Sequence, residues 1–252
     1  MKIQYVSDLH LEFQENASYI KHHTLPVVGD VLVIAGDTLY LGKYFTQHPF
    51  WDWCAENYKQ TIVCMGNHEF YQYYDLSSMQ DGTDIEIRPN VHAYFNKVVR
   101  LEDIDLVVST MWSFIPPEDA RYTEHYISDF HRILYGEDLL TANDFNREHQ
   151  RYLAFIKKAV AESKATKKIV VTHHVPSFQM QDPRFAGSRA NGGFTVELQD
   201  YIKDSGIDYW IYGHSHHNVD VKIGNTWCVS NQLGYVFHGE NETFNPAKII
   251  EL

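Results

Sequence analysis

Short clusters of aspartate, histidine and asparagine recur along this 252-residue chain. Each cluster follows an apolar run, so it places a metal-binding atom where a buried strand is expected to end. Together they supply enough nitrogen and oxygen ligands for two metal ions, which favours a dinuclear hydrolase. The five clusters are Asp8-Leu9-His10, Gly36-Asp37, Gly66-Asn67-His68-Glu69, His173-His174 and Gly213-His214-Ser215-His216.

The spacing within the clusters suggests how two ions would be shared. Asp8 and His10 lie two positions apart, as do His214 and His216, and in extended backbone such side chains point the same way. Oxygen and imidazole ligands without a thiolate suit Mn, Fe, Zn or Co. Two ions about 3.5–4 Å apart form a clamp for displacement at phosphorus. One ion is expected at Asp8, His10, Asp37 and His216, and the other at Asp37, Asn67, His173 and His214, with Asp37 bridging them.

Other residues of the clusters receive different roles. Asn67 is a neutral ligand, and the adjacent His68 cannot easily reach the same ion, so we expect His68 to act as an acid or electrostatic group. Glu69 is expected to hold the other ring nitrogen of His68, as carboxylates near metal sites commonly do. Adjacent residues point apart, so His173, directly after the strand, is the expected ligand, and His174 is either a pocket residue or a group that supports a ligand.

Apolar, β-branched runs alternate with helical patterns. Several runs are nearly continuous, which is typical of strands covered on both faces. Amphipathic spacing predicts helices over residues 143–163 and 195–205, and Gly224-Asn225 predicts a hairpin turn. Because βα units come first and antiparallel β follows, we expect mixed sheets with helices outside. The expected strands cover residues 3–6, 31–35, 61–65, 106–109, 169–172, 209–212, 219–223, 226–230 and 248–252.

The organisation of the chain predicts a single domain over residues 1–252. Length alone allows one large domain or two small ones, but no repeat, low-complexity tract or linker divides the sequence. The 44% hydrophobic content suffices for a sizeable core. Two less regular segments, residues 71–89 and 113–140, are either functional covers of a site or surface insertions.

The charge balance bears on the class of partner. The formal net charge is −12 and no run of Lys or Arg exceeds two residues, which argues against binding to long nucleic acids. No apolar stretch approaches the ~20 residues of a membrane helix, and no signal sequence precedes the first strand. The three cysteines are sparse and lie in apolar runs, so a cytoplasmic protein is expected. The oligomeric state is left open.

The order of the clusters resembles that of the calcineurin-like metallophosphoesterases. The motifs D-x-H, G-D, G-N-H-E, H-x-x-P and G-H-x-H carry the resemblance, which spans Asp8 to Gly234. Further similarity to a bacterial branch of small, single-domain members lies in residues 171–177, Trp112, Asp129-Phe130 and residues 231–235. The resemblance implies an α/β fold, a four-layer α/β/β/α sandwich of two mixed sheets, with the ligand assignment given above.

We therefore expect a dinuclear metal-dependent phosphoesterase in which metal-bound hydroxide attacks phosphorus and His68 assists the leaving group. The expected substrate is a small phosphomonoester or phosphodiester, with neither nucleic acid nor membrane as partner. His174, Asn231 and Trp112 are candidate walls of the substrate pocket. Two alternatives remain, a nuclease and a non-catalytic metal-binding scaffold. The net charge argues against the first, and the complete ligand set argues against the second.

Overall fold

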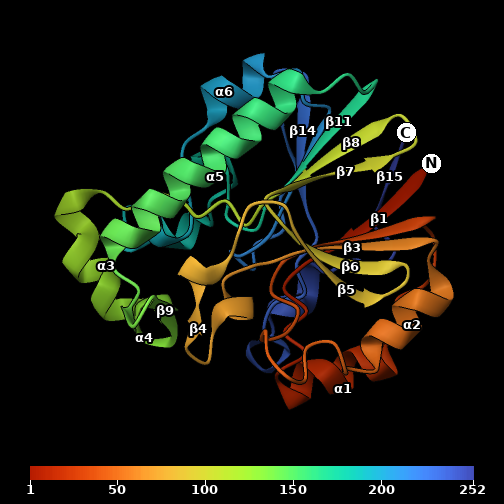
Figure 1. Ribbon diagram of the computed structural model, residues 1–252, viewed down its shortest axis with the longest axis horizontal. Helices are drawn as coiled ribbons and strands as arrows, with labels where there is room; N and C mark the ends of the chain where they lie inside the picture. The colour runs from red at the N-terminus through yellow and green to blue at the C-terminus, as the bar shows by residue number, and fades with distance from the viewer.

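Two six-stranded mixed sheets face each other in the computed structural model, which describes residues 1–252. Helices cover the outer face of each sheet, as Figure 1 shows. The result is the four-layer α/β/β/α sandwich expected from the sequence.

The two sheets share one design, with four parallel strands in the middle and an antiparallel strand at each edge. Parallel neighbours need long crossover connections, which place helices on the outer faces. The first sheet contains, in order, β15 (Ile249–Glu251), β1 (Lys2–Val6), β2 (Val31–Ala35), β3 (Gln60–Cys64), β6 (Val91–Phe95) and β5 (Thr83–Arg88). The second contains β13 (Val221–Ile223), β14 (Thr226–Ser230), β12 (Tyr209–Tyr212), β11 (Lys167–Val171), β8 (Ile104–Val108) and β7 (Lys97–Leu101).

Six helices and a small third sheet complete the fold. The longest helix, α5, starts at a capping box in which Thr141 and Asp144 each satisfy a backbone N–H of the other. The helices are α1 (Gln14–His22), α2 (Phe50–Asn57), α3 (Ala120–Tyr126), α4 (Asp129–Arg132), α5 (Ala142–Glu162) and α6 (Gln199–Asp204). The small sheet contains β10 (Asp138–Leu139), β9 (Ile133–Tyr135) and β4 (Tyr74–Asp75).

Three apolar cores lie between the four layers. Alternate residues of a strand point to opposite faces of its sheet, so each sheet contributes to two cores. Val33 and Ile211, from different sheets, share the central core. Ile34 packs with α1 and α2 in a second core, and Trp210 packs with α5 and α6 in a third. The near-continuous apolar strands follow from this two-sided burial.

The elements agree largely with those predicted from the sequence. All nine expected strands are present within two residues at each end, and the helix predicted over residues 143–163 is α5. The helix predicted over residues 195–205 is wrong at its start, because Thr195 forms a β-bridge with Val175 and the helix begins only at Gln199. Residues 71–89 are also more regular than expected, since β5 pairs with β6 at the sheet edge.

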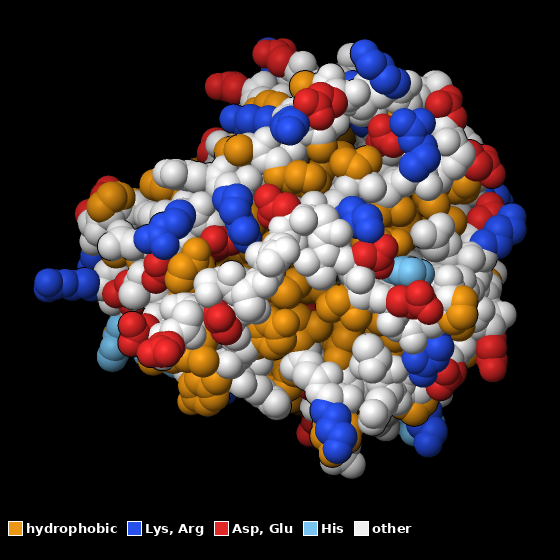
Figure 2. Space-filling view, viewed as in Figure 1, with side chains coloured by type: hydrophobic (Ala, Val, Ile, Leu, Met, Phe, Trp, Pro, Cys, Tyr) orange, Lys and Arg blue, Asp and Glu red, His pale blue; other side chains and the backbone are white.

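The surface in Figure 2 carries charges of both signs. On this face, Lys and Arg side chains are scattered among Asp and Glu rather than gathered into a band, and apolar side chains occupy its centre. No helix in the structure combines the length and apolar character that crossing a membrane requires.

Candidate metal centre

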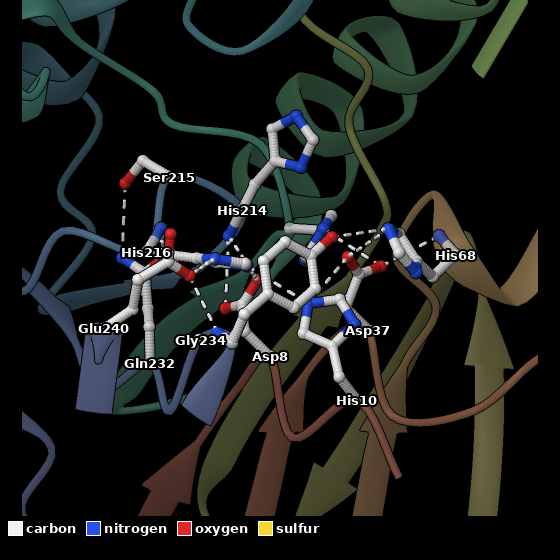
Figure 3. A network of polar contacts seen from close by, with 12 residues as sticks. Asp8, His10, Asp37, His68, His214, Ser215, His216, Gln232, Gly234 and Glu240 are labelled. Carbon is white, nitrogen blue, oxygen red and sulfur yellow. Dashed lines mark hydrogen bonds and ion pairs between the residues drawn. The ribbon is translucent and has the colours of Figure 1, made fainter. Parts of the chain in front are cut away.

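The loops that leave the central strands of both sheets carry the expected metal-binding residues. Figure 3 shows Asp8, His10, Asp37 and His216 converging between the sheets, with His68 beside Asp37. All the expected ligands except His216 are buried. Strands β1, β2 and β3 lead to Asp8, His10, Asp37 and Asn67, and strands β11 and β12 lead to His173, His214 and His216.

The backbone at these loops is left-handed where extended conformation was expected. The alternation of side chains in a strand therefore does not explain why residues two apart meet. Left-handed backbone is unfavourable for non-glycine residues, and it persists only where the surrounding structure enforces it. The positive φ angles are 54° at Asp8, 46° at His10, 54° at Asp37, 74° at His214 and 49° at His216.

Two glycines allow the loops to approach each other closely. A Cβ atom at Gly36, which has φ 92°, would collide with the ring of His173. A Cβ atom at Gly66 would collide with the carboxylate of Asp37. Only glycine fits at either position, so both motif glycines have a steric role in forming the site.

The first group of ligand atoms belongs to Asp8, His10 and His216, which lie within 4.8 Å of one another. The Nε2 atoms of His10 and His216 are 3.1 Å apart, and His216 Nε2 is 3.4 Å from Asp8 Oδ1. Asp37 Oδ2 lies 3.7 Å from His10 Nε2. One carboxylate and two imidazoles therefore form this group, with the Asp37 carboxylate beside His10, a donor set that fits a divalent transition metal.

The second group belongs to Asp37, His173 and His214, also within 4.8 Å of one another. His173 Nε2 is 3.2 Å from Asp37 Oδ1 and 3.0 Å from Asn67 Oδ1. The two oxygens of Asp37 thus face different groups, Oδ2 towards His10 and Oδ1 towards His173. Asp37 is therefore the carboxylate that lies between the two groups.

The amide of Asn67 is oriented by residues outside the ligand clusters. Its Nδ2 donates a hydrogen bond to Asp129 Oδ1 at 2.8 Å, and the Tyr71 hydroxyl donates to the same oxygen at 2.7 Å. Asn67 Oδ1 is therefore directed at His173. Burial raises the pKa of Asp129. The sequence identified Asp129 only through the family resemblance and assigned it no role.

The adjacent histidines point in different directions, as expected. The ring of His173 is held by a 2.8 Å contact between Nδ1 and the carbonyl oxygen of Ala35, which leaves Nε2 facing Asp37. His174 lies behind the ligands with its ring centroid 4.1 Å from that of His214, and its Nδ1 contacts Ser113 Oγ at 3.0 Å. It does not line the cavity described below and instead contacts a ligand, the second of its two expected roles.

The partner of His68 differs from the prediction. Glu69 accepts hydrogen bonds from the backbone N–H groups of Gly66, Asp37 and Thr38 at 2.7, 3.0 and 2.8 Å, so it fixes two loops and does not reach the His68 ring. Burial and the nearby Asp37 charge raise the pKa of Glu69 to about 7. His68 Nδ1 instead lies 2.8 Å from Glu12 Oε1. Sequence reasoning missed Glu12, although it follows His10 by two positions.

Opposite charges pair within the buried site. Burial alone lowers the pKa of both His173 and His216. For His173, attraction to Asp37 outweighs burial and raises the pKa to about 9. For His216, hydrogen bonds with Asp8 and Glu240 raise it to about 10. Burial and the His173 charge lower the pKa of His214 to about 3. Without a bound cation, two of the ligand rings therefore carry protons at neutral pH.

A cavity of about 490 Å³ opens over the two ligand groups. One wall comes from residues 126–129, within the predicted cover over residues 113–140. The predicted cover over residues 71–89 contributes only Tyr71. Further wall residues come from the segment 181–195, which no sequence pattern singled out. The ligand side of the cavity is formed by Asp37, Asn67, His68, His214 and His216.

Two candidate pocket residues are structural instead. Trp112 is fully buried and packs against Phe145 with ring centroids 5.2 Å apart. Asn231 Nδ2 donates to the carbonyl oxygens of Tyr5 and Asn245 at 2.9 and 2.8 Å, and so joins the end of β14 to neighbouring segments. Neither residue lines the cavity, because each side chain is buried among the neighbours just named.

Comparison with known proteins places this site in a family context. The family model described as "Calcineurin-like phosphoesterase" matches residues 1–218. Protein L509 of Acanthamoeba polyphaga mimivirus, itself described as uncharacterised, is 26% identical over 99% of this chain and 96% of its own length. The phosphopantetheinyl hydrolase (PptH) of Mycobacterium tuberculosis has a similar solved structure, with a TM-score of 0.72, 15% identity, and coverage of 99% of this chain and 95% of that one. This second likeness concerns the fold alone.

Proposed function

The chain belongs to the calcineurin-like phosphoesterase family and is therefore a metal-dependent hydrolase of phosphoester bonds. We propose that it uses two divalent cations to hydrolyse a small phosphomonoester or phosphodiester. The observation that carries the dinuclear proposal is Asp37, whose two oxygens face separate ligand groups. Asp8, His10 and His216 would hold one cation, and Asn67, His173 and His214 the other. Mn, Fe, Zn and Co all suit this donor set.

The bound cations would supply a nucleophile available near neutral pH and would neutralise charge on the phosphoryl oxygens. The protein residues supply position and a proton. His68 lines the cavity beside Asp37, with its Nε2 3.9 Å from Asp37 Oδ2. Burial lowers the pKa of His68, but Asp37 and Glu12 raise it overall, which favours a ring that can donate a proton to the leaving oxygen.

The charges around the cavity support a substrate with one phosphoryl group. Arg184 is the one Lys or Arg side chain that lines the cavity, and it already contacts Asp182 Oδ2 through two nitrogens at 2.8 and 2.6 Å. Away from the ligand groups, no free cation is thus available for a second anionic group. Exposed aromatic rings of Tyr126 and Phe185 form part of the walls, which favours an uncharged, apolar or ring-bearing remainder.

The experiment that tests this function uses metal-stripped protein reloaded separately with Mn²⁺, Fe²⁺, Zn²⁺ or Co²⁺. An aryl phosphate, an aryl phosphodiester, a phosphopantetheinyl ester and a fluorescent DNA duplex form the substrate panel, with Asp37→Asn as the matched control. We expect metal-dependent turnover of at least one small ester and slow cleavage of the duplex. Inactivity with every metal and ester would contradict the proposal and favour the scaffold alternative.

A higher kcat/KM on the duplex would instead favour the nuclease alternative. The net charge of −12 and the dispersed Lys and Arg side chains in Figure 2 support our preference for a small ester over a polyanion. We also propose a cytoplasmic location, since all three cysteines are free and buried.

A further inference from the structure

Glu12 connects one expected metal ligand with the expected acid. Its Oε1 atom lies 3.0 Å from Nδ1 of His10 and 2.8 Å from Nδ1 of His68. The Glu12 side chain is 5% exposed, and its other oxygen, Oε2, is buried without a hydrogen-bond partner. A single carboxylate oxygen thus accepts hydrogen bonds from two imidazole rings in a buried position.

These hydrogen bonds determine which nitrogen each ring presents to the site. A ring that donates from Nδ1 to a carboxylate keeps that nitrogen protonated and turns Nε2 to the opposite side. His10 Nε2 accordingly lies 3.1 Å from His216 Nε2. His68 Nε2 lies 3.2 Å from the hydroxyl of Tyr235, which also lines the cavity.

Aromatic packing alone would not define this arrangement. Tyr71 stacks on His68 with ring centroids 4.2 Å apart, and Tyr40 stacks on it at 6.1 Å. Stacking fixes the plane of a ring, but it leaves open which nitrogen faces the cavity. Glu12 is the one hydrogen-bond partner of His68 Nδ1, so the choice between the two ring orientations depends on this contact.

We propose that Glu12 is a positioning residue that holds His68 with Nε2 towards the leaving group and holds His10 with Nε2 towards the metal site. This inference rests on the proposed function. It predicts that loss of Glu12 impairs proton donation by His68 more than it impairs binding of substrate. The effect should be strongest for esters whose leaving group most needs a proton.

The kinetic test compares Glu12→Gln and Glu12→Ala with wild type on aryl phosphoesters of increasing leaving-group pKa, at saturating metal. We expect kcat to fall about 10- to 100-fold for the poorest leaving groups, with a smaller loss for the best ones and little change in KM. Glu148→Gln is the matched control, because the Glu148 side chain is 4% exposed, close to the value for Glu12, but pairs with Arg151 and Tyr135 away from the site. It should leave the leaving-group dependence unchanged.

A double-mutant cycle with His68→Ala tests whether Glu12 acts through His68. In the His68→Ala protein, adding Glu12→Gln should produce no further loss that depends on the leaving group. Equal slowing of all esters, or loss of metal as the sole defect of Glu12→Gln, would overturn the inference.

A readout independent of turnover is the NMR signal of the His68 Nδ1 proton in Zn²⁺-loaded protein. We expect a downfield signal protected from solvent exchange in wild type and its loss in Glu12→Ala. An unchanged signal would overturn the positioning role. An inactive wild type that retains this Glu12-dependent signal would contradict the proposed function while supporting the contact itself.

Discussion

The two sheets contribute different chemistry to one site. Loops after the first sheet carry both carboxylate ligands, Asp8 and Asp37, whereas loops after the second sheet carry only imidazoles. Groups from the second sheet contact the carboxylates of the first. The His214 backbone N–H donates a hydrogen bond to Asp8 at 3.0 Å, and His173 Nε2 lies 3.2 Å from Asp37 Oδ1. The sandwich therefore assembles its ligand set only when the two sheets pack together.

The residues that orient the ligands also differ between the two halves, with one exception. In the first half, the carboxylates of Glu12 and Asp129 orient His10 and Asn67. In the second half, backbone carbonyl oxygens contact His173 and His214, and His216 alone has a carboxylate partner outside the ligand set, Glu240. A carbonyl group fixes a ring without adding charge, while a carboxylate also changes the proton affinity of its partner. We therefore expect substitutions of the orienting carboxylates to perturb proton chemistry, and substitutions of the ligands themselves to perturb metal content in either half.

The largest effect is expected for Asp37→Asn, because Asp37 is the one proposed ligand that faces both groups. Loss of its charge should weaken both metal sites and abolish turnover. Elemental analysis should find close to two ions per chain in reconstituted wild type. In the variant, neither of the two metal sites should be fully occupied. Asp182→Asn, in the cavity wall, is the control. One fully retained ion in Asp37→Asn would contradict the bridging assignment.

In the second half, His173→Ala should remove one metal site and abolish turnover. The neighbouring His174→Ala should spare most of the metal and leave KM little changed, because His174 packs against His214 behind the ligands and does not line the cavity. Metal analysis and steady-state kinetics on the two variants distinguish the residues. Metal loss in His174→Ala with normal content in His173→Ala would reverse the assignment.

In the first half, His68→Ala should retain both metals while kcat falls ~10²–10⁴-fold, the usual range for loss of a general acid or base. The loss should shrink for esters whose leaving group needs no proton. Tyr235→Phe, which removes a hydroxyl near His68 Nε2, serves as a mild comparison. If His68→Ala protein lost a metal, His68 would be a ligand and the separation of roles would be wrong.

A smaller effect concerns protons released on metal loading. The pKa values of about 9 for His173 and about 10 for His216 mean that both rings are protonated at pH 7 without a cation. Metal binding must displace these protons, so affinity should fall as the pH decreases. Calorimetry in buffers of different ionisation enthalpy should report release of about one proton per ion. Release near zero would contradict the charge state inferred here.

The sequence anticipated those parts of the site that a local pattern encodes. Asp37 and His173 each follow an apolar run, so their places at strand ends could be predicted from the chain alone. Glu12 and Asp129 could not be assigned in this way, because their partners His68 and Asn67 lie 56 and 62 positions away. Such contacts depend on how the loops meet in space, and polar residues on loops carry no periodic signal.

The cavity walls show the same limit. Residues 181–195 form one wall, yet they contain no apolar period and no motif that would indicate a functional segment. Trp112 and Asn231 were expected at the pocket because of the family resemblance, but a resemblance in sequence does not distinguish a core contact from a wall. The left-handed backbone at Asp8 and His10 is signalled only weakly by their residue types, because Asp and His are enriched at positive φ but adopt it in a small fraction of cases.

The left-handed backbone at the ligand positions implies a conflict between catalytic activity and thermal stability. At φ 74°, His214 occupies a conformation that glycine adopts without strain and alanine does not. In metal-free protein, His214→Gly should therefore have a higher melting temperature than His214→Ala, although both lose the metal ligand. A reversed order of melting temperatures would contradict this view. Selection for heat resistance alone would then tend to erode the ligand positions, and any stabilisation programme for this chain should keep activity in its screen.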